Sequence, residues 1–157
     1  MNEIPIDLVI PIYNEGEKII KLLEEFNSHI KTKYRILLCY DSEDDNIFQQ
    51  KEKFKNFNFE IKLIKNPGTG PCSAVIQGLN HGGSECTIVY PADDFLNFNI
   101  IDKMYFAFKQ NNDIVVASRF MKDGSMKGCP IIKSILVRTA SSTLYFFSSI
   151  PVKDASN

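Results

Sequence analysis

The 157 residues include 18 Lys and Arg against 19 Asp and Glu, so the formal net charge is −1 and gives no argument for a nucleic-acid partner. The length suits one domain, and every apolar run is shorter than the roughly 18 residues that a membrane span needs. The four cysteines are widely spaced without a C-x-x-C pair, and no signal-peptide pattern is visible; both features predict reduced thiols and a cytoplasmic location.

Short apolar strands alternate with amphipathic helices along the chain. Strands are predicted over residues 4–12, 34–40, 59–64, 86–90 and 113–117. Helices follow them, one opening at Asn14 and the others covering about 46–55, 72–80, 100–108 and 131–149. This alternation predicts the α/β class: one Rossmann-like domain, residues 1–157, with a mostly parallel sheet and helices on both faces.

The first helix has the clearest start signal. Asn14 stands at the N-cap position and Glu17 at the third helical position, which is the pattern of a capping box. The apolar residues that follow at helical spacing are Ile19, Leu22, Leu23, Phe26 and Ile30. The pattern predicts one apolar face packed on the sheet.

Polar residues follow every predicted strand. In wound α/β folds the carboxyl ends of parallel strands meet at one edge, and ligands bind there. The residues at these ends are Tyr13-Asn14-Glu15, Asp41, the loop 66–70, Asp93-Asp94 and Ser118-Arg119. Their convergence predicts a binding site at this edge.

Asp93 and Asp94 close the fourth strand. Two adjacent carboxylates repel each other unless a cation or hydrogen-bond donors compensate their charge. Oxygen ligands of this kind suit Mg²⁺ or Mn²⁺, which also bind substrate phosphates. The alternative is a solvated turn that caps the next helix.

Three other strand ends have two interpretations each. Asp41 is placed to accept hydrogen bonds from a ribose hydroxyl or a base, or to form a turn. The loop from Asn66 to Gly70 is glycine-rich but is not a Walker A motif, so it either cradles phosphate or connects a strand tightly to a helix. Arg119 suits a phosphate or is an exposed surface residue.

The fragments VIPIYNE, YDSEDD, NPGTG, YPADD and ASRF, in this order, resemble family 2 glycosyltransferases of the GT-A type. Within that family the chain is most similar to the polyprenyl-phosphate sugar transferases. The resemblance implies an enzyme, a hexosyltransferase with a UDP- or GDP-sugar donor and Mg²⁺ or Mn²⁺ as cofactor. It also implies a polyprenyl phosphate acceptor.

The resemblance assigns nucleotide contacts to several positions. The family lines its base pocket at the positions of Pro11, Tyr13 and Glu15. Asp41 matches the acidic contact to the nucleoside, and Gly68 with Gly70 matches the glycine-containing loop.

The resemblance also implies catalytic and acceptor residues. Asp93 matches the second aspartate of the metal motif, and Asp94 is a candidate to replace the first, whose position is occupied by Pro91. Arg119 matches a phosphate-handling arginine. The residues implied to hold the acceptor phosphate are Lys133 and Arg138. A second departure is Tyr40, which stands where the family has the first of two aspartates.

Residues 150–157 resemble the approach to a further family segment, which predicts a truncated chain whose missing segment associates peripherally with the inner face of the membrane. Two other functions stay open at this point. One is transfer to a saccharide acceptor in cell-surface polysaccharide synthesis, with Asp154 as candidate base. The other is a non-catalytic nucleotide-sugar-binding domain. A nucleotidyltransferase is a third interpretation, but a triphosphate loop near the first strand is not evident.

Overall fold

The computed structural model describes residues 4–120, 124, 130–148 and 154. The chain falls into two compact units, Met1–Phe106 and Ala107–Asn157, and each is described by itself. None of the helices in the described part of the chain is long and apolar enough to cross a bilayer.

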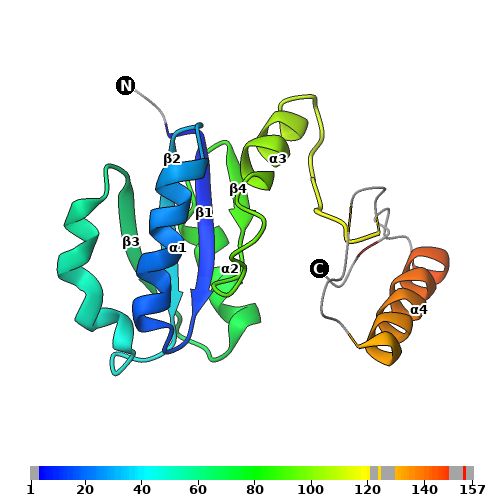
Figure 1. Cartoon of the computed structure of the whole chain (residues 1–157), viewed down its shortest axis with the longest axis horizontal. Coiled ribbons are helices and arrows are strands. Elements are labelled where there is room, and N and C mark those ends of the chain that lie inside the picture. Colours follow the sequence, from blue (N-terminus) through cyan, green and yellow to red (C-terminus); the bar gives the residue numbers. More distant parts are fainter. Residues whose placement is uncertain (1–3, 121–123, 125–129, 149–153, 155–157) are drawn as a thin grey trace. The chain divides into compact units, whose positions relative to one another are not determined.

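The first unit is built on a parallel sheet of four strands, β1 (Ile6–Ile12), β2 (Tyr34–Tyr40), β3 (Glu60–Lys65) and β4 (Cys86–Val89). Their spatial order is β3-β2-β1-β4, which can be followed in Figure 1. The chain therefore moves outward from β1 to β3 and then returns to the free side of β1. This reversal of direction confirms the Rossmann-like fold and places its switch point between β1 and β4.

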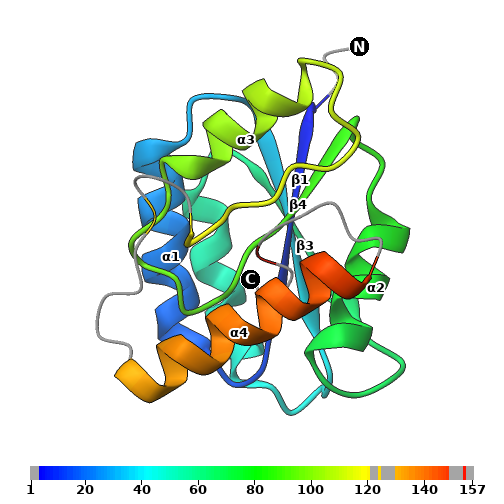
Figure 2. The same ribbon diagram turned by 90° about the vertical axis from the view of Figure 1, so that its right-hand side faces the viewer.

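Helices cover both faces of this sheet, as predicted. α1 (Gly16–His29) and the 3₁₀-helix η1 (Asn46–Asn56) lie on one face, together with α3 (Ile100–Phe108). α2 (Pro71–His81) lies on the other face, as Figure 2 shows. Right-handed crossovers explain this division, because the helices of outward and returning connections must lie on opposite faces.

The core lies on both sides of β1 and β2. Because helices cover both faces, these strands read as almost continuous apolar runs. The fully buried apolar residues of these strands are Ile6, Leu8, Val9, Ile10, Ile36, Leu37, Leu38 and Cys39. On the α1 side, the predicted apolar face is confirmed by the burial of Ile19, Leu22, Leu23 and Phe26, whereas Ile30 follows the end of the helix and is half-buried.

α2 approaches the sheet closely through a glycine. A Cβ atom at Gly78 would lie 2.2 Å from Cγ1 of Val9 and 2.9 Å from Sγ of Cys39. The absence of a side chain at Gly78 therefore sets the distance between α2 and the central strands. Val9 and Cys39 belong to the same buried cluster as Ala74 of α2.

The amino end of the sheet carries a buried ion pair. Asp7 is fully buried and accepts hydrogen bonds from Nε and Nη2 of Arg35 at 2.7 and 2.8 Å. It also accepts the backbone N–H groups of Gly83 and Ser84. The pair thus fastens β1 to β2 and to the turn before β4.

One predicted element was wrong, and another has a different helix type. Residues 113–117 form no strand: Ile114 is 79% exposed, and the run pairs with no strand among the described residues. An apolar run becomes a strand only where a neighbour satisfies its backbone groups. The helix predicted over residues 46–55 is present as η1, but it is a 3₁₀-helix rather than an α-helix, and only Ile47 and Gln50 of it are buried.

The predicted capping box is also wrong. α1 begins at Gly16, and its N-cap residue is Glu15, which makes no side-chain capping bond. Asn14 has a positive φ of 55°, and its side-chain oxygen accepts the backbone N–H of Asn46 at 3.4 Å. The asparagine therefore joins the start of α1 to the start of η1 instead of capping α1.

Candidate functional site

At the switch point, the pairing between β1 and β4 ends near the carboxyl ends of the two strands. The two strands pair from Ile6 with Cys86 as far as Val9 with Val89, and the N–H of Tyr90 donates to the carbonyl of Val9. β1 then continues to Ile12, while the chain after Tyr90 turns toward α3. In wound α/β folds, ligands bind at such a switch point, outside the carboxyl ends of the strands.

Asp41 lies at the same carboxyl edge of the sheet, directly after β2, and two hydrogen bonds hold its carboxylate in place. One carboxylate oxygen accepts Nδ2 of Asn66 at 2.7 Å, and the other accepts the N–H of Gly70 at 2.8 Å. The residue is half-buried. Because a carboxylate has about four lone-pair sites, both oxygens keep capacity for a ligand.

Asn66 organises the glycine-containing loop and is only 1% exposed. Its side-chain oxygen accepts the N–H of Gly68 at 3.1 Å and the hydroxyl of Ser73 at 2.7 Å. Gly70 has φ 84° and ψ 167°, a conformation essentially restricted to glycine. The loop is thus one hydrogen-bonded unit with Asp41, and the structure brings Asp41, Gly68 and Gly70 together as predicted.

Sequence reasoning missed Asp45 at this edge of the sheet, and it named Asn66 only as part of the glycine-containing loop, without its contact to Asp41. Asp45 is 5% exposed and accepts the backbone N–H of Asn14 at 2.8 Å, so it fixes the turn that follows β1. The position of Asn66 directly after a predicted strand placed it at this edge, but the sequence did not indicate the side-chain hydrogen bond to Asp41. For Asp45 the DSEDD run offered several equivalent acids, and only the fold distinguishes them.

The three predicted base-pocket residues lie along the end of β1. Pro11 is half-buried in β1, where it pairs with Cys39 of β2. Tyr13 is 70% exposed immediately after the strand. Glu15 forms an ion pair with Lys18 at 3.0 Å. Of these three, Tyr13 presents the largest open surface to a ligand.

Asp93 and Asp94 differ in their surroundings. Asp94 accepts the N–H groups of Leu96 and Asn97 on one oxygen and Nδ2 of Asn97 on the other, at 2.7–3.2 Å. It therefore shapes the turn before α3. Asp93 is exposed, and no hydrogen bond or ion pair of its side chain occurs within the described part of the chain.

A divalent metal fits this edge only in a limited way. Among the described residues, no three Asp, Glu, His or Cys side chains are grouped as a ready-made metal cage. Mg²⁺, however, is commonly held by one or two carboxylates together with waters and substrate phosphates. Asp93 supplies one carboxylate of this kind, and Asp94 retains one open lone pair on Oδ2.

Arg119 lies in the second unit, where its guanidinium is oriented by Asp154. Nε and Nη2 donate to the two carboxylate oxygens at 3.0 and 2.6 Å, and the Arg119 backbone N–H adds a third bond at 2.9 Å. Asp154 is 1% exposed. Both oxygens of Asp154 thus accept from Arg119, an arrangement that orients a guanidinium.

The remaining predicted acceptor residues, Lys133 and Arg138, belong to α4 (Ile131–Phe147) of the second unit. Both are exposed, and the guanidinium carbon of Arg138 lies 5.0 Å from the ring centroid of Phe120. Arg119 lies 5.7 Å from the same ring. Arg119 and Arg138 therefore lie close to the same aromatic ring in the second unit.

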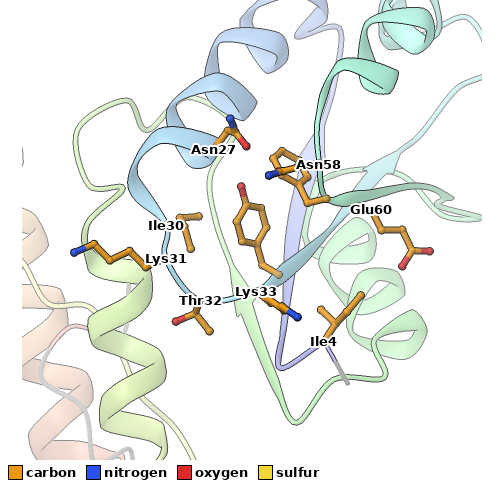
Figure 3. Close-up of a pocket in the computed structure, with 10 residues that line it drawn as sticks. Ile4, Asn27, Ile30, Lys31, Thr32, Lys33, Asn58 and Glu60 are labelled. Carbon is orange, nitrogen blue, oxygen red and sulfur yellow. The ribbon is translucent and has the colours of Figure 1, made fainter. Parts of the chain in front are cut away.

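A separate cavity of about 440 Å³ lies at the opposite end of the sheet, among residues near the starts of β2 and β3. Figure 3 shows Asn27 of α1 and Asn58, which precedes β3, at its border. The hydroxyl of Tyr34 is buried there without a hydrogen-bond partner among the described residues, and burial raises its pKa. None of the predicted site residues lines this cavity.

Comparison with protein families gives one match over most of the chain. The model described as glycosyl transferase family 2 matches residues 7–152. Among solved structures, TarS 1–349 of S. aureus, crystallised in complex with UDP, superposes with a TM-score of 0.57. The alignment has 19% identity and covers 76% of this chain and 40% of TarS 1–349, which shows a shared fold.

Curated relatives are similar in sequence but considerably longer. A dolichol-phosphate mannosyltransferase of Pyrococcus furiosus is 25% identical over 86% of this chain and 39% of its own length. A dolichyl-phosphate beta-glucosyltransferase of Saccharomyces cerevisiae is 33% identical over 69% of this chain and 35% of its own length. An undecaprenyl-phosphate 4-deoxy-4-formamido-L-arabinose transferase of Proteus mirabilis is 31% identical over 56% and 28%. The chain thus spans well under half of these relatives.

Proposed function

We propose that this chain, which belongs to glycosyl transferase family 2, binds a nucleoside-diphosphate sugar at the carboxyl end of its sheet and supports sugar transfer to a polyprenyl phosphate. One observation carries the proposal: the Asp41 carboxylate is fixed by Asn66 and Gly70 beside the switch point, with acceptor capacity remaining. The names of three relatives, each of which includes a polyprenyl phosphate, support the acceptor class.

The nucleoside part of the donor is assigned to the β1 and β2 strand ends. Asp41 accepts a hydrogen bond from a ribose hydroxyl or a base N–H. Its carboxylate is already held by Asn66 and Gly70, so it can make this bond without changing conformation. Tyr13, with 70% of its surface exposed, offers an aromatic face for the base. Pro11 and Glu15 complete the proposed pocket wall.

The diphosphate part of the donor is assigned to Asp93, with Asp94 as the second candidate ligand. A carboxylate repels a diphosphate, so this assignment requires a cation between them. Mg²⁺ or Mn²⁺ bound there supplies positive charge that stabilises the leaving diphosphate. The chain's own contribution is to hold Asp93 at the end of β4, while the hydrogen bonds of Asp94 keep the turn in shape.

The acceptor is assigned to the basic residues of the second unit. In the proposed reaction, a phosphate oxygen attacks the anomeric carbon, its lone pair forms the new C–O bond, and the bond to the diphosphate breaks. A phosphate monoester is already anionic near neutral pH, so no general base is required. Arg119, held by Asp154, positions this phosphate, and Lys133 and Arg138 add charge.

The donor site is tested by calorimetric titration of UDP- and GDP-sugars in the presence and absence of Mn²⁺. We expect Mn²⁺ to strengthen binding to the wild-type chain and to have little effect on Asp93→Ala. The matched control is Asp44→Ala, because Asp44 is also an exposed aspartate on a loop at this end of the sheet. Metal-independent binding that Asp93→Ala leaves unchanged would remove the metal assignment.

The acceptor class is tested separately, with a radiolabelled donor and either a polyprenyl phosphate or a saccharide as acceptor. Arg119→Lys keeps the charge but loses the fork that pairs with Asp154, so transfer to the lipid phosphate should fall by about 10²-fold. Transfer to the saccharide alone would favour polysaccharide synthesis. Donor binding without any transfer, in a protein with the full length of its relatives, would favour a non-catalytic binding domain.

A further inference from the structure

The Tyr34 hydroxyl is buried beside a cavity and has no hydrogen-bond partner among the described residues. Tyr34 is 7% exposed and lines the cavity of about 440 Å³ at the amino end of the sheet, which we call the Tyr34 cavity. Burying a hydroxyl without a hydrogen bond costs free energy, so native proteins keep few such groups. A ligand in the Tyr34 cavity would supply the missing bond.

Tyr90 provides the contrast within the same unit. It is 3% exposed, and its hydroxyl donates to the backbone carbonyl of Asp94 at 3.1 Å. Burial raises the pKa of both tyrosines, so both phenols stay protonated at neutral pH. A protonated phenol donates one hydrogen bond and also accepts. The chain uses this capacity at Tyr90 and leaves it unused at Tyr34.

Aromatic rings form one wall of the Tyr34 cavity. The ring centroid of Tyr34 lies 4.7 Å from that of Phe59, and Phe59 stacks on Phe57 at 5.2 Å. Phe59 lines the Tyr34 cavity, whereas Phe57 lines a second hollow of about 360 Å³. Asn27 lines both, so the two hollows are adjacent. Their volumes fall in the range of small-molecule sites.

Two asparagines supply polar groups at the border of the Tyr34 cavity (Figure 3). Asn27 and Asn58 are both exposed, and neither side chain forms a hydrogen bond within the described part of the chain. Each amide has a donor and an acceptor. The phenol and the two amides therefore offer mixed donors and acceptors, which match hydroxyl groups because each hydroxyl also donates and accepts.

The charges around the two hollows do not select an ion. The charged lining residues are three lysines and two glutamates, namely Lys31, Lys33, Lys53, Glu24 and Glu60. Figure 3 shows the side chains of Lys31 and Glu60 extending outward from the Tyr34 cavity. Glu60 is also paired with Arg35 and Lys62. A neutral ligand rich in hydroxyl groups therefore fits this lining better than a phosphate or a carboxylate.

We propose that the Tyr34 cavity is a second binding site, for a neutral mono- or disaccharide, at the end of the sheet opposite the proposed donor site. In the complex the Tyr34 hydroxyl bonds to a sugar hydroxyl, and the amides of Asn27 and Asn58 bond to others. The apolar face of the sugar ring packs on Phe59. This site needs neither a nucleotide nor sugar transfer, so its occupancy is measured without a donor.

The test is nuclear magnetic resonance of the isotope-labelled 157-residue chain, titrated with glucose, mannose, galactose, N-acetylglucosamine, maltose and cellobiose. We expect at least one saccharide to shift the side-chain amide signals of Asn27 and Asn58, with other shifts confined to residues of the two hollows. Glycerol at the same concentration should give no such shifts. Saturating UDP with Mn²⁺ should leave the saccharide affinity unchanged, because the two sites lie at opposite ends of the sheet.

Matched variants locate the site. Tyr34→Phe should weaken saccharide binding about tenfold and Asn27→Ala about fivefold, because each removes a hydrogen bond to the ligand. Tyr90→Phe is the control for the first, as an equally buried tyrosine whose hydroxyl already has a partner. Asn80→Ala is the control for the second, since Asn80 is an exposed asparagine near the end of α2, as Asn27 is near the end of α1. Both controls should keep the wild-type affinity.

The unliganded chain gives an independent readout. Tyr34→Phe should raise the midpoint of thermal unfolding, because it removes a buried hydroxyl without a partner, whereas Tyr90→Phe should lower it. Equal losses in both variants would mean that the Tyr34 hydroxyl is already satisfied and would overturn the proposal. Absence of shifts with every saccharide would overturn it as well. Saccharide binding that UDP with Mn²⁺ abolishes, or that Tyr34→Phe leaves unchanged, would place the sugar elsewhere.

Discussion

Aspartates lie at both ends of the parallel sheet, but their charges are compensated differently. At the amino end, Asp7 is fully buried and accepts two hydrogen bonds from Arg35 and two from backbone N–H groups. Burial by itself raises the pKa of Asp7, but these bonds outweigh it and hold the pKa below its ordinary value. The charge at this end is balanced within the chain.

At the carboxyl end the charge is not balanced in the same way. Asp41 accepts only neutral donors on its carboxylate, and Asp94 accepts only backbone and amide groups. Asp93 has no ion pair among the described residues. At this end of the sheet, hydrogen bonds orient the carboxylates of Asp41 and Asp94 but do not neutralise their charge. A ligand would have to supply the counter-charge. A metal-bound diphosphate would bring its own cation, which is why this end is the proposed donor site.

The largest expected effect is the loss of stability when the amino-end pair is broken. Asp7→Ala should lower the free energy of unfolding by about 3–5 kcal/mol, because the mostly buried Arg35 loses both hydrogen bonds to Asp7 and keeps only the exposed Glu60, 3.7 Å from Nη1. Urea unfolding measures this difference. The matched control is Asp102→Ala, since Asp102 also accepts two backbone N–H groups but no guanidinium. We expect about 1 kcal/mol there. Equal losses in the two variants would show that the ion pair adds nothing.

The next largest effect on stability is expected from replacing a glycine at the carboxyl end of the sheet, compared with a glycine at the amino end. Gly70→Ala should cost about 1–3 kcal/mol, because φ 84° with ψ 167° strains any residue with a Cβ atom, although nothing lies within 4 Å of that atom. At the amino end, a Cβ on Gly83 would meet Nη2 of Arg35 at an ordinary 3.8 Å. Gly83→Ala should therefore change stability by less than about 0.5 kcal/mol. Thermal and urea unfolding of both variants provide the check, and a tolerated Gly70→Ala would contradict the strain argument.

The third prediction concerns the charge of Asp41 at the carboxyl end of the sheet and its effect on nucleotide-sugar binding. Asp41→Asn should weaken binding of the preferred nucleotide-sugar about tenfold, because it removes a charged acceptor from the proposed nucleoside contact. Titration calorimetry measures the change, with Asp44→Asn as the exposed control on the same loop. Unfolding in urea should show only about 1 kcal/mol of lost stability. Unchanged donor affinity would place the nucleoside away from Asp41.

Much of this fold follows from the sequence, because the strands of the first unit carry their own signal. β1 and β2 are apolar runs that only a doubly covered sheet explains, and the polar residues at their ends locate the candidate edge. The Rossmann-like winding was predicted as well, whereas the strand order β3-β2-β1-β4 comes from the structure. The α1 face was predicted from spacing and is buried as expected.

The remaining features depend on tertiary partners that no local pattern encodes. Residues 113–117 have strand composition, yet Ile114 is exposed and no described strand pairs with them. Asn14 has the chemistry of an N-cap, but the hydrogen bond from its own N–H to Asp45 directs it to η1. The sequence indicated only that Asn66 belongs to the glycine-containing loop. In the structure Asn66 is buried, and its side chain donates a hydrogen bond to Asp41. For both asparagines, a contact distant in sequence decides the role.

The smallest expected effect is on the pH dependence of stability, because the Asp7 carboxylate stays ionised at neutral pH. Its pKa in the folded state lies below the ordinary value near 3.8, so the unfolded chain binds protons first as the pH falls. The stabilisation is therefore complete above about pH 5 and is lost progressively as the pH falls through 3.8 toward the folded pKa. Urea unfolding between pH 7 and pH 3 should show a flatter acid limb for Asp7→Asn than for the wild type. Because the pKa of Asp102 is lowered as well, Asp102→Asn should flatten part of the same limb, and a wild-type slope in both variants would mean that other carboxylates govern acid unfolding.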